Sequence, residues 1–168
     1  MKDRLLFLSA TFVAYIPLFA IQKPLFMAYN HSLSEATLND WFAVILHGLS
    51  LDMTIAGYLS VIPFLLTLLS VWIKAPWHII LKVYFLIAAV LISTIFSVDM
   101  ALYPYWGFRL DSTILFYLES PKDAMASIPV MQFIQQFLFF ITYATAITWV
   151  CWRWLVPILK VKVTRHIA

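Results

Sequence analysis

Apolar residues fill four long runs of this chain, and only short polar stretches separate them. A helix needs about 20 predominantly apolar residues to cross the ~30 Å hydrocarbon core of a bilayer, and each run is long enough to do so. The pattern therefore predicts an all-α integral membrane protein with four transmembrane helices. The runs are Leu5 to Gln22, Trp41 to Ile73, Trp77 to Val98 and Val130 to Trp152.

The second run is too long for one crossing, because its roughly 33 residues would make ~50 Å of helix. We expect residues 53–73 to cross the membrane and residues 41–52 to extend the helix above it or to bend along it. Thr37 and Asp40 have the spacing of a capping box and can begin this helix. The predicted helices, in a single domain of residues 1–168, are about 5–22, 51–73, 77–99 and 130–154.

The first run would also suit a cleaved signal peptide. It is long for such a segment, however, and no Ala-x-Ala site follows it, so we expect a retained helix with a kink at Pro17. Small or polar residues recur every fourth position in the second and third helices, which lets neighbouring helices approach closely. The two sets are Gly48, Asp52, Ala56 and Ser60, and Ala89, Ser93, Ser97 and Ala101.

Residues 100–129 form the longest stretch that is not mainly apolar, and we expect an outer loop there. Pro104 and Gly107 predict the end of the third helix. Asp111 or Ser112 can cap a short helix, and Ser120-Pro-Lys-Asp can begin a second. The loop is therefore predicted to carry two interfacial helices, with the Trp106 ring at the level of the lipid headgroups.

The same stretch resembles a known family. It reads Asp-x-x-Leu-Tyr-x-Tyr-Trp-Gly-Phe-Arg-Leu-Asp from Asp99, then Phe-Tyr-Leu-x-Ser-Pro-Lys-Asp-Ala from Phe116. This order of motifs is similar to the membrane domain of lipoteichoic acid synthase-like proteins, which are sulfatase-fold phosphoglycerol (or related headgroup) transferases. The resemblance implies a downstream extracytoplasmic catalytic domain that holds the nucleophile and a divalent metal such as manganese, with no cofactor in this chain. It also implies contact with membrane lipids, including phosphatidylglycerol-type headgroups.

Composition and charge support a membrane protein and predict its orientation. Hydrophobic residues make up 64% of the chain and charged residues 11%, against roughly 45–50% and 25% in soluble domains. The net charge of +3 does not indicate nucleic-acid binding, because the basic residues gather at helix ends. In the four-helix arrangement most of them fall on the side of both chain ends, which predicts that both termini face the cytoplasm. A transferase acting outside would then require one further crossing before its catalytic domain.

Five residues are candidates for lipid contact or structural ion pairs. Asp99 and Asp52 are expected on the same outer side, with Arg109 near both, since a partly buried arginine needs such partners. Asp52 can either face the bundle and bind an arginine, a lysine or a headgroup, or remain a solvated interfacial carboxylate. Asp111 and Trp106 complete the set.

No catalytic arrangement is recognisable in the sequence. The four histidines have no paired metal-ligand spacing, no glycine-rich phosphate loop is present, and the single Cys151 lies in an apolar run. Three functions remain open. They are the membrane-anchoring domain of such a transferase, a small transporter or channel subunit, and a non-enzymatic membrane assembly protein.

Overall fold

The computed structural model describes residues 2–30, 37–107, 109–110 and 129–159. Four long helices make up nearly all of this part, and it contains no strand. The last helix continues into a short π-helical turn and a 3-10 turn, η2 and η3. The elements are α1 (Lys2–Tyr29), α2 (Leu38–Leu69), α3 (Trp77–Trp106), α6 (Val130–Val150), η2 (Cys151–Leu155) and η3 (Val156–Ile158).

Each of the four helices is long and apolar enough to cross a membrane. When the η2 and η3 turns are counted with α6, the four spans have 28 to 32 residues, which corresponds to about 42–48 Å of helix. This length matches the ~40–45 Å of a bilayer with its headgroup layers. Large apolar side chains also point outward from the bundle. Ile95, Leu138 and Trp149, for example, are each about 60% exposed. The protein is therefore a multi-pass, all-α membrane protein.

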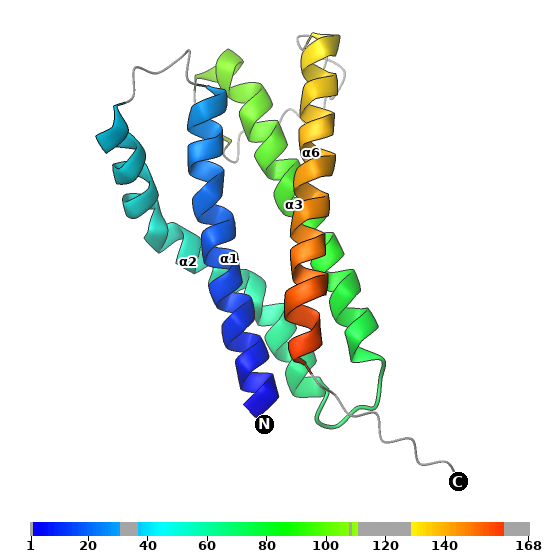
Figure 1. Ribbon diagram of the computed structural model, residues 1–168. Helices are drawn as coiled ribbons and strands as arrows, with labels where there is room; N and C mark the ends of the chain where they lie inside the picture. Colours follow the sequence, from blue (N-terminus) through cyan, green and yellow to red (C-terminus); the bar gives the residue numbers. More distant parts are fainter. Residues whose placement is uncertain (1, 31–36, 108, 111–128, 160–168) are drawn as a thin grey trace.

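The bundle consists of two helix pairs. α1 packs mainly on α2, and α3 packs mainly on α6 (Figure 1). The η2 and η3 turns join the pairs, because they contact both α1 and α3. Figure 1 also shows that α2 bends: its first part diverges from α1 and the rest crosses α1 obliquely. α1 begins and α6 ends at the same end of the bundle. We call it the Trp77 end, and the opposite end the Trp106 end.

The two predicted sets of small residues lie at helix contacts. On α3, Ala89, Ser93, Ser97 and Ala101 are all buried. On α2, Ala56 is fully buried and Asp52 is 4% exposed. Small side chains on one face allow close approach of the neighbouring helix, as the four-residue spacing predicted.

α1 and α3 end later than predicted, in each case beyond a proline, whereas α2 ends at Leu69 instead of residue 73. α1 continues through Pro24 to Tyr29 instead of ending at residue 22. α3 continues past Pro104 to Trp106 instead of ending at residue 99. Proline is tolerated in membrane helices where neighbouring groups satisfy the freed carbonyls. The predicted role of Gly107 is confirmed, since it ends α3 with φ +72°.

Pro63 shows how such a carbonyl is satisfied. A proline has no N–H for the carbonyl four residues earlier, which for Pro63 is that of Leu59. The hydroxyl of Tyr84, on α3, donates a hydrogen bond to this Leu59 oxygen. Pro63 itself is fully buried. The proline on α2 and the tyrosine on α3 therefore form a matched contact between the two helices.

The start of α2 also follows the prediction. The Asp40 carboxylate accepts hydrogen bonds from the backbone N–H of Thr37 at 2.8 Å and from its hydroxyl at 2.7 Å. Backbone N–H groups in the first turn of a helix have no partner within the helix, and an acidic residue at this position is favourable there. Thr37 and Asp40 therefore begin α2 three residues before the apolar run.

Candidate functional site

Polar and charged side chains gather at the Trp106 end. In the first group of contacts, Asp99 binds residues that follow α3. Its Oδ2 accepts hydrogen bonds from Arg109 Nε at 2.9 Å and Nη2 at 2.6 Å. Its Oδ1 accepts the backbone N–H of Leu110 at 2.8 Å. The Asp99 side chain is only 5% exposed, whereas that of Arg109 is 56% exposed. One buried carboxylate thus fixes the chain that follows α3 against the end of the helix.

Arg109 also reaches the first helix. Its guanidinium carbon lies 4.7 Å above the centre of the Phe26 ring, close enough for a cation–π contact. Phe26 in turn packs edge to face on Tyr103, with ring centres 4.9 Å apart, and belongs to a buried cluster with Phe96 and Met100. The residues after α3 are therefore bound to both α3 and α1.

A second ion pair joins α1 to α2. Lys23 Nζ donates to Asp52 Oδ2, and the two side chains are 11% and 6% exposed. The lysine lies across Gly48: a Cβ added at that glycine would be 2.1 Å from Lys23 Cε. Gly48 thus leaves the space through which Lys23 reaches Asp52. Lys23 is six residues before the end of α1, so the pair lies about 9 Å below that end.

The structure places the predicted charges in two pairs. Asp99 and Arg109 are in contact, while the partner of Asp52 is Lys23. Asp52 faces the bundle, one of the two alternatives that the sequence left open. The first helix was predicted to end at residue 22, so Lys23 fell just beyond it and its contact with Asp52 was not expected. The signal that could have found it is the continued apolar pattern from Leu25 to Tyr29, which extends the helix beyond the lysine.

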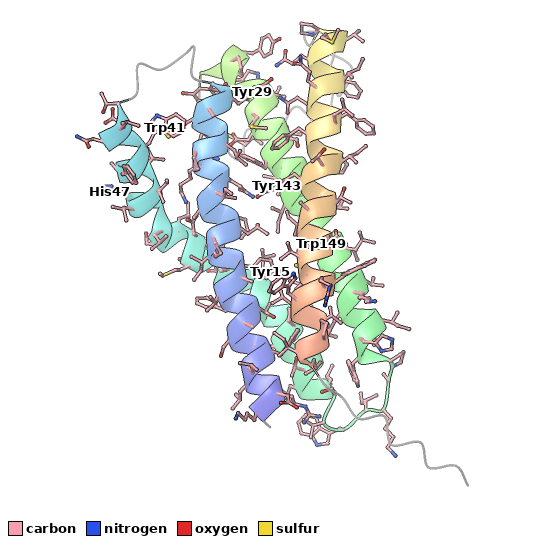
Figure 2. The ribbon with its side chains drawn as sticks, viewed as in Figure 1. Tyr15, Tyr29, Trp41, His47, Tyr143 and Trp149 are labelled. Atoms are coloured by element: carbon pink, nitrogen blue, oxygen red, sulfur yellow. The ribbon has the colours of Figure 1, made fainter. Side chains whose placement is uncertain are left out.

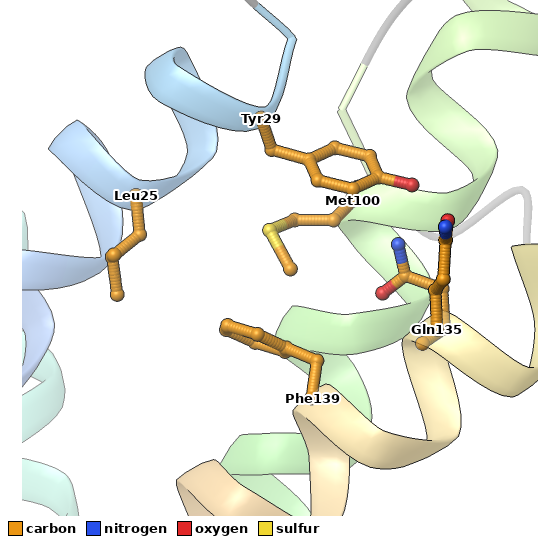
Figure 3. A pocket seen from close by; sticks show the side chains of 6 residues that line it. Leu25, Tyr29, Met100, Gln135 and Phe139 are labelled. Atoms are coloured by element: carbon orange, nitrogen blue, oxygen red, sulfur yellow. The ribbon is translucent and has the colours of Figure 1, made fainter.

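Between α1, α3 and α6 the same end contains a pocket of about 460 Å³. Figure 3 shows the Tyr29 ring next to Met100, with Leu25 and Gln135 on opposite sides and Phe139 below. Gln136 is only 8% exposed, and its Oε1 has no hydrogen-bond partner among the described residues. The pocket was not predicted. It is lined by Leu25, Tyr29, Met100, Gln135, Gln136 and Phe139.

Two tyrosine contacts hold α6 in place beside this pocket. The Tyr143 hydroxyl accepts a hydrogen bond from Gln22 Nε2 and donates one to the Leu18 carbonyl, both at 3.1 Å. Figure 2 shows Tyr143 in the interior of the bundle. Nearer the end, Tyr105 donates to Gln132 Oε1 at 2.6 Å. α6 is thus hydrogen-bonded to α1 and to α3.

Of the two other candidates, Trp106 lies within the described residues. Trp106 is the last residue of α3 and is half-buried. Asp111 lies outside the described residues. His47 projects away from the other helices (Figure 2), and its Nδ1 is hydrogen-bonded to the Ala43 carbonyl of its own helix at 2.7 Å. Within the described ranges, no group of three His, Cys, Asp or Glu side chains could hold a metal ion.

Comparisons with protein families, with curated proteins and with solved structures found no match to this chain.

Proposed function

We propose that this chain is the membrane-anchoring domain of a lipoteichoic acid synthase-like phosphoglycerol (or related headgroup) transferase, with its Trp106 end at the outer face of the cytoplasmic membrane. The observation that carries the proposal is the contact of Asp99 with Arg109 and Leu110. All three residues belong to the sequence motif on which the resemblance rests. The motif thus has a physical role in this chain, which is to fix the outer connection to the ends of α3 and α1.

The charge distribution supports the proposed orientation. Lys23 and Arg109, the basic residues described at the Trp106 end, are each paired with an aspartate. The other described basic residues have no salt bridge to a described carboxylate. Lys and Arg are enriched on the cytoplasmic side of membrane proteins, and more of the described basic residues lie at the Trp77 end than at the Trp106 end. The residues at the Trp77 end are Lys2, Arg4, Lys74, Lys82 and Arg153.

The described residues do not fit a catalytic centre of this family, since they offer no metal-binding cluster. In the proposed protein, the metal and the nucleophile belong to an extracytoplasmic domain, and the four helices hold that domain at the leaflet in which its lipid substrate lies.

A chimaera tests the proposal. This chain would replace the corresponding helices of a lipoteichoic acid synthase-like enzyme that keeps its own last spanning helix and catalytic domain, in cells that lack the enzyme. We expect restored synthesis of the glycerol phosphate polymer, and reduced synthesis with Asp99→Asn. The matched control is Asp40→Asn, which changes a carboxylate at the exposed start of α2. A chimaera that is inserted and stable but makes no polymer would exclude the anchoring function.

One observation favours a small ion-coupled transporter as the second candidate. Lys23 on α1 and Asp52 on the bent helix α2 form a buried ion pair, and charged pairs within spanning helices often mark ion pathways. Proteoliposomes with a pH-sensitive dye inside distinguish the two functions. A proton flux that is lost in the Asp52→Asn variant would favour the transporter. A proton leak no greater than that of protein-free vesicles would favour the anchoring domain.

A further inference from the structure

Positive charge is concentrated at the Trp77 end, and very little negative charge lies beside it. Of the eight acidic residues of the chain, only Asp3 belongs to this end, and it has no salt bridge with a described residue. The others lie in the first half of α2, in the last third of α3, or in the two segments that connect helices at the Trp106 end. Residues 160–168 add lysine and arginine but no aspartate or glutamate. The basic groups of this end therefore lack anions from the protein itself.

Lys82 is the basic residue at this end that is held in a defined contact. Trp152 Nε1 donates a hydrogen bond to the Lys82 carbonyl at 3.0 Å, and Lys82 Nζ lies 5.3 Å from the centre of the same indole ring. This distance is within the range of a cation–π contact. Lys82 is half-buried, and no described carboxylate pairs with its ammonium group. Arg153 is exposed and follows Trp152 directly, so it adds a second positive charge beside the first.

The depth of Lys82 indicates which anion can reach it. Lys82 is five residues from the start of α3, or about 7.5 Å along the helix. Trp72 and Trp154, at the same end, are 70% and 67% exposed. Exposed indole rings are typical of the layer where lipid headgroups meet the hydrocarbon core. Basic side chains between spanning helices at this level bind the phosphate groups of anionic lipids.

The surface directly below the two charges is apolar on both helices. Leu86, one turn deeper on α3 than Lys82, is 42% exposed, and Trp149, one turn deeper on α6 than Trp152, is 62% exposed. α3 and α6 pack against each other, so these side chains belong to neighbouring helices. A charged upper part above an apolar lower part matches a phospholipid, with its phosphate at Lys82 and its acyl chain below.

We infer that Lys82, Trp152 and Arg153 bind the headgroup of one anionic phospholipid, with its acyl chain along Leu86 and Trp149. The two positive charges attract the phosphate and disfavour the choline or ethanolamine group of zwitterionic lipids. In the proposed orientation this lipid lies in the cytoplasmic leaflet, opposite to the leaflet of the transferase substrate. The inference requires neither that orientation nor the transferase, because it rests only on the contacts and charges of the Trp77 end.

Native mass spectrometry of the full chain tests this inference. The protein would be released from detergent micelles after addition of phosphatidylglycerol or of phosphatidylcholine with the same acyl chains, and the first lipid bound would be measured. We expect phosphatidylglycerol to bind more tightly. Lys82→Gln should weaken its binding about fivefold, the effect of the ~1 kcal/mol that one basic residue contributes near an anionic lipid, and Lys82→Arg should retain it. Equal affinities of the unaltered protein for the two lipids would overturn the inference.

Matched variants separate a site from general attraction to positive charge. Lys2→Gln removes the same charge at the exposed start of α1 and should leave the first binding step within about twofold, so an equal loss in Lys2→Gln and Lys82→Gln would refute the site. Trp149→Ala should weaken phosphatidylglycerol binding, whereas Trp72→Ala removes an equally exposed indole elsewhere and should not. Soluble glycerol phosphate should not displace the lipid; displacement at equal concentration would show a site for a dissolved anion instead.

Discussion

Gly48→Ala tests the path of Lys23 most directly, because the structure gives the substitution two opposing effects. A methyl group at residue 48 would lie 2.1 Å from Lys23 Cε and 2.8 Å from Nζ. Ordinary contacts between carbon atoms are about 3.5–4.0 Å, so the lysine would have to move by more than 1 Å. Its side chain is flexible enough to do so, but it would then leave the Asp52 carboxylate.

The expected magnitude follows from these two effects. Leaving one charge of a buried pair without its partner costs about 3–5 kcal/mol, and a displaced pair loses part of this amount. Replacing a mid-helix glycine by alanine gains about 0.5–1 kcal/mol. We therefore expect Gly48→Ala to lower the free energy of unfolding by roughly 2 kcal/mol. In a Lys23→Ala, Asp52→Ala background the sign should reverse, and the alanine should stabilise by about 0.5–1 kcal/mol.

The assay is reversible unfolding in mixed detergent and dodecyl sulfate micelles, followed by the helical circular dichroism signal. Gly57→Ala is the matched control, since an added Cβ at this second glycine of α2 meets nothing within 4 Å. It should stabilise the protein in both backgrounds. If Gly48→Ala stabilises the wild-type protein as much as it stabilises the double variant, the Lys23 side chain does not pack over residue 48 and the reasoning is wrong.

Three further predictions concern the Trp106 end. Asp99→Asn removes the negative charge that binds Arg109, so trypsin should cleave after Arg109 more easily. We expect this cleavage to be about five- to thirtyfold faster, which corresponds to a loss of about 1–2 kcal/mol. Cleavage after Arg4 should be unchanged. Tyr143→Phe leaves Gln22 Nε2 without this acceptor and should lower the free energy of unfolding by about 1–2 kcal/mol in the same micelle assay. Trp106, as the only tryptophan of a variant, should be quenched by lipids brominated near the headgroup; quenching by a water-soluble agent alone would contradict its interfacial position.

The fold could be predicted largely because apolar runs determine spanning helices. Each run became a helix, and the glycine that ends α3 and the small-residue face of that helix followed from local rules. The errors came from prolines. Pro24 and Pro104 lie in the last turns of their helices, where only a few hydrogen bonds are lost and packing of Phe26 and Tyr103 keeps the helix intact. Sequence spacing contains no information about that packing.

The candidate site was less predictable, because its contacts join residues far apart in the chain. Asp99 and Arg109 are ten residues apart across one turn, so their pairing could be expected from the sequence. The Lys23 contact to Asp52 depends on how α1 and α2 cross, and the pocket depends on three helices at once. No single-helix pattern contains that geometry.

The contact of Tyr84 with the Leu59 carbonyl has a consequence for how the protein enters the membrane during synthesis. α2 leaves the ribosome before α3, and its Leu59 carbonyl then has no donor, which costs several kcal/mol in hydrocarbon. Entry of α2 together with α3 as a hairpin would supply the tyrosine hydroxyl at the moment of insertion. The turn of residues 70–76 is short enough to keep the two helices together, so this proline favours paired insertion over the release of α2 into the lipid alone.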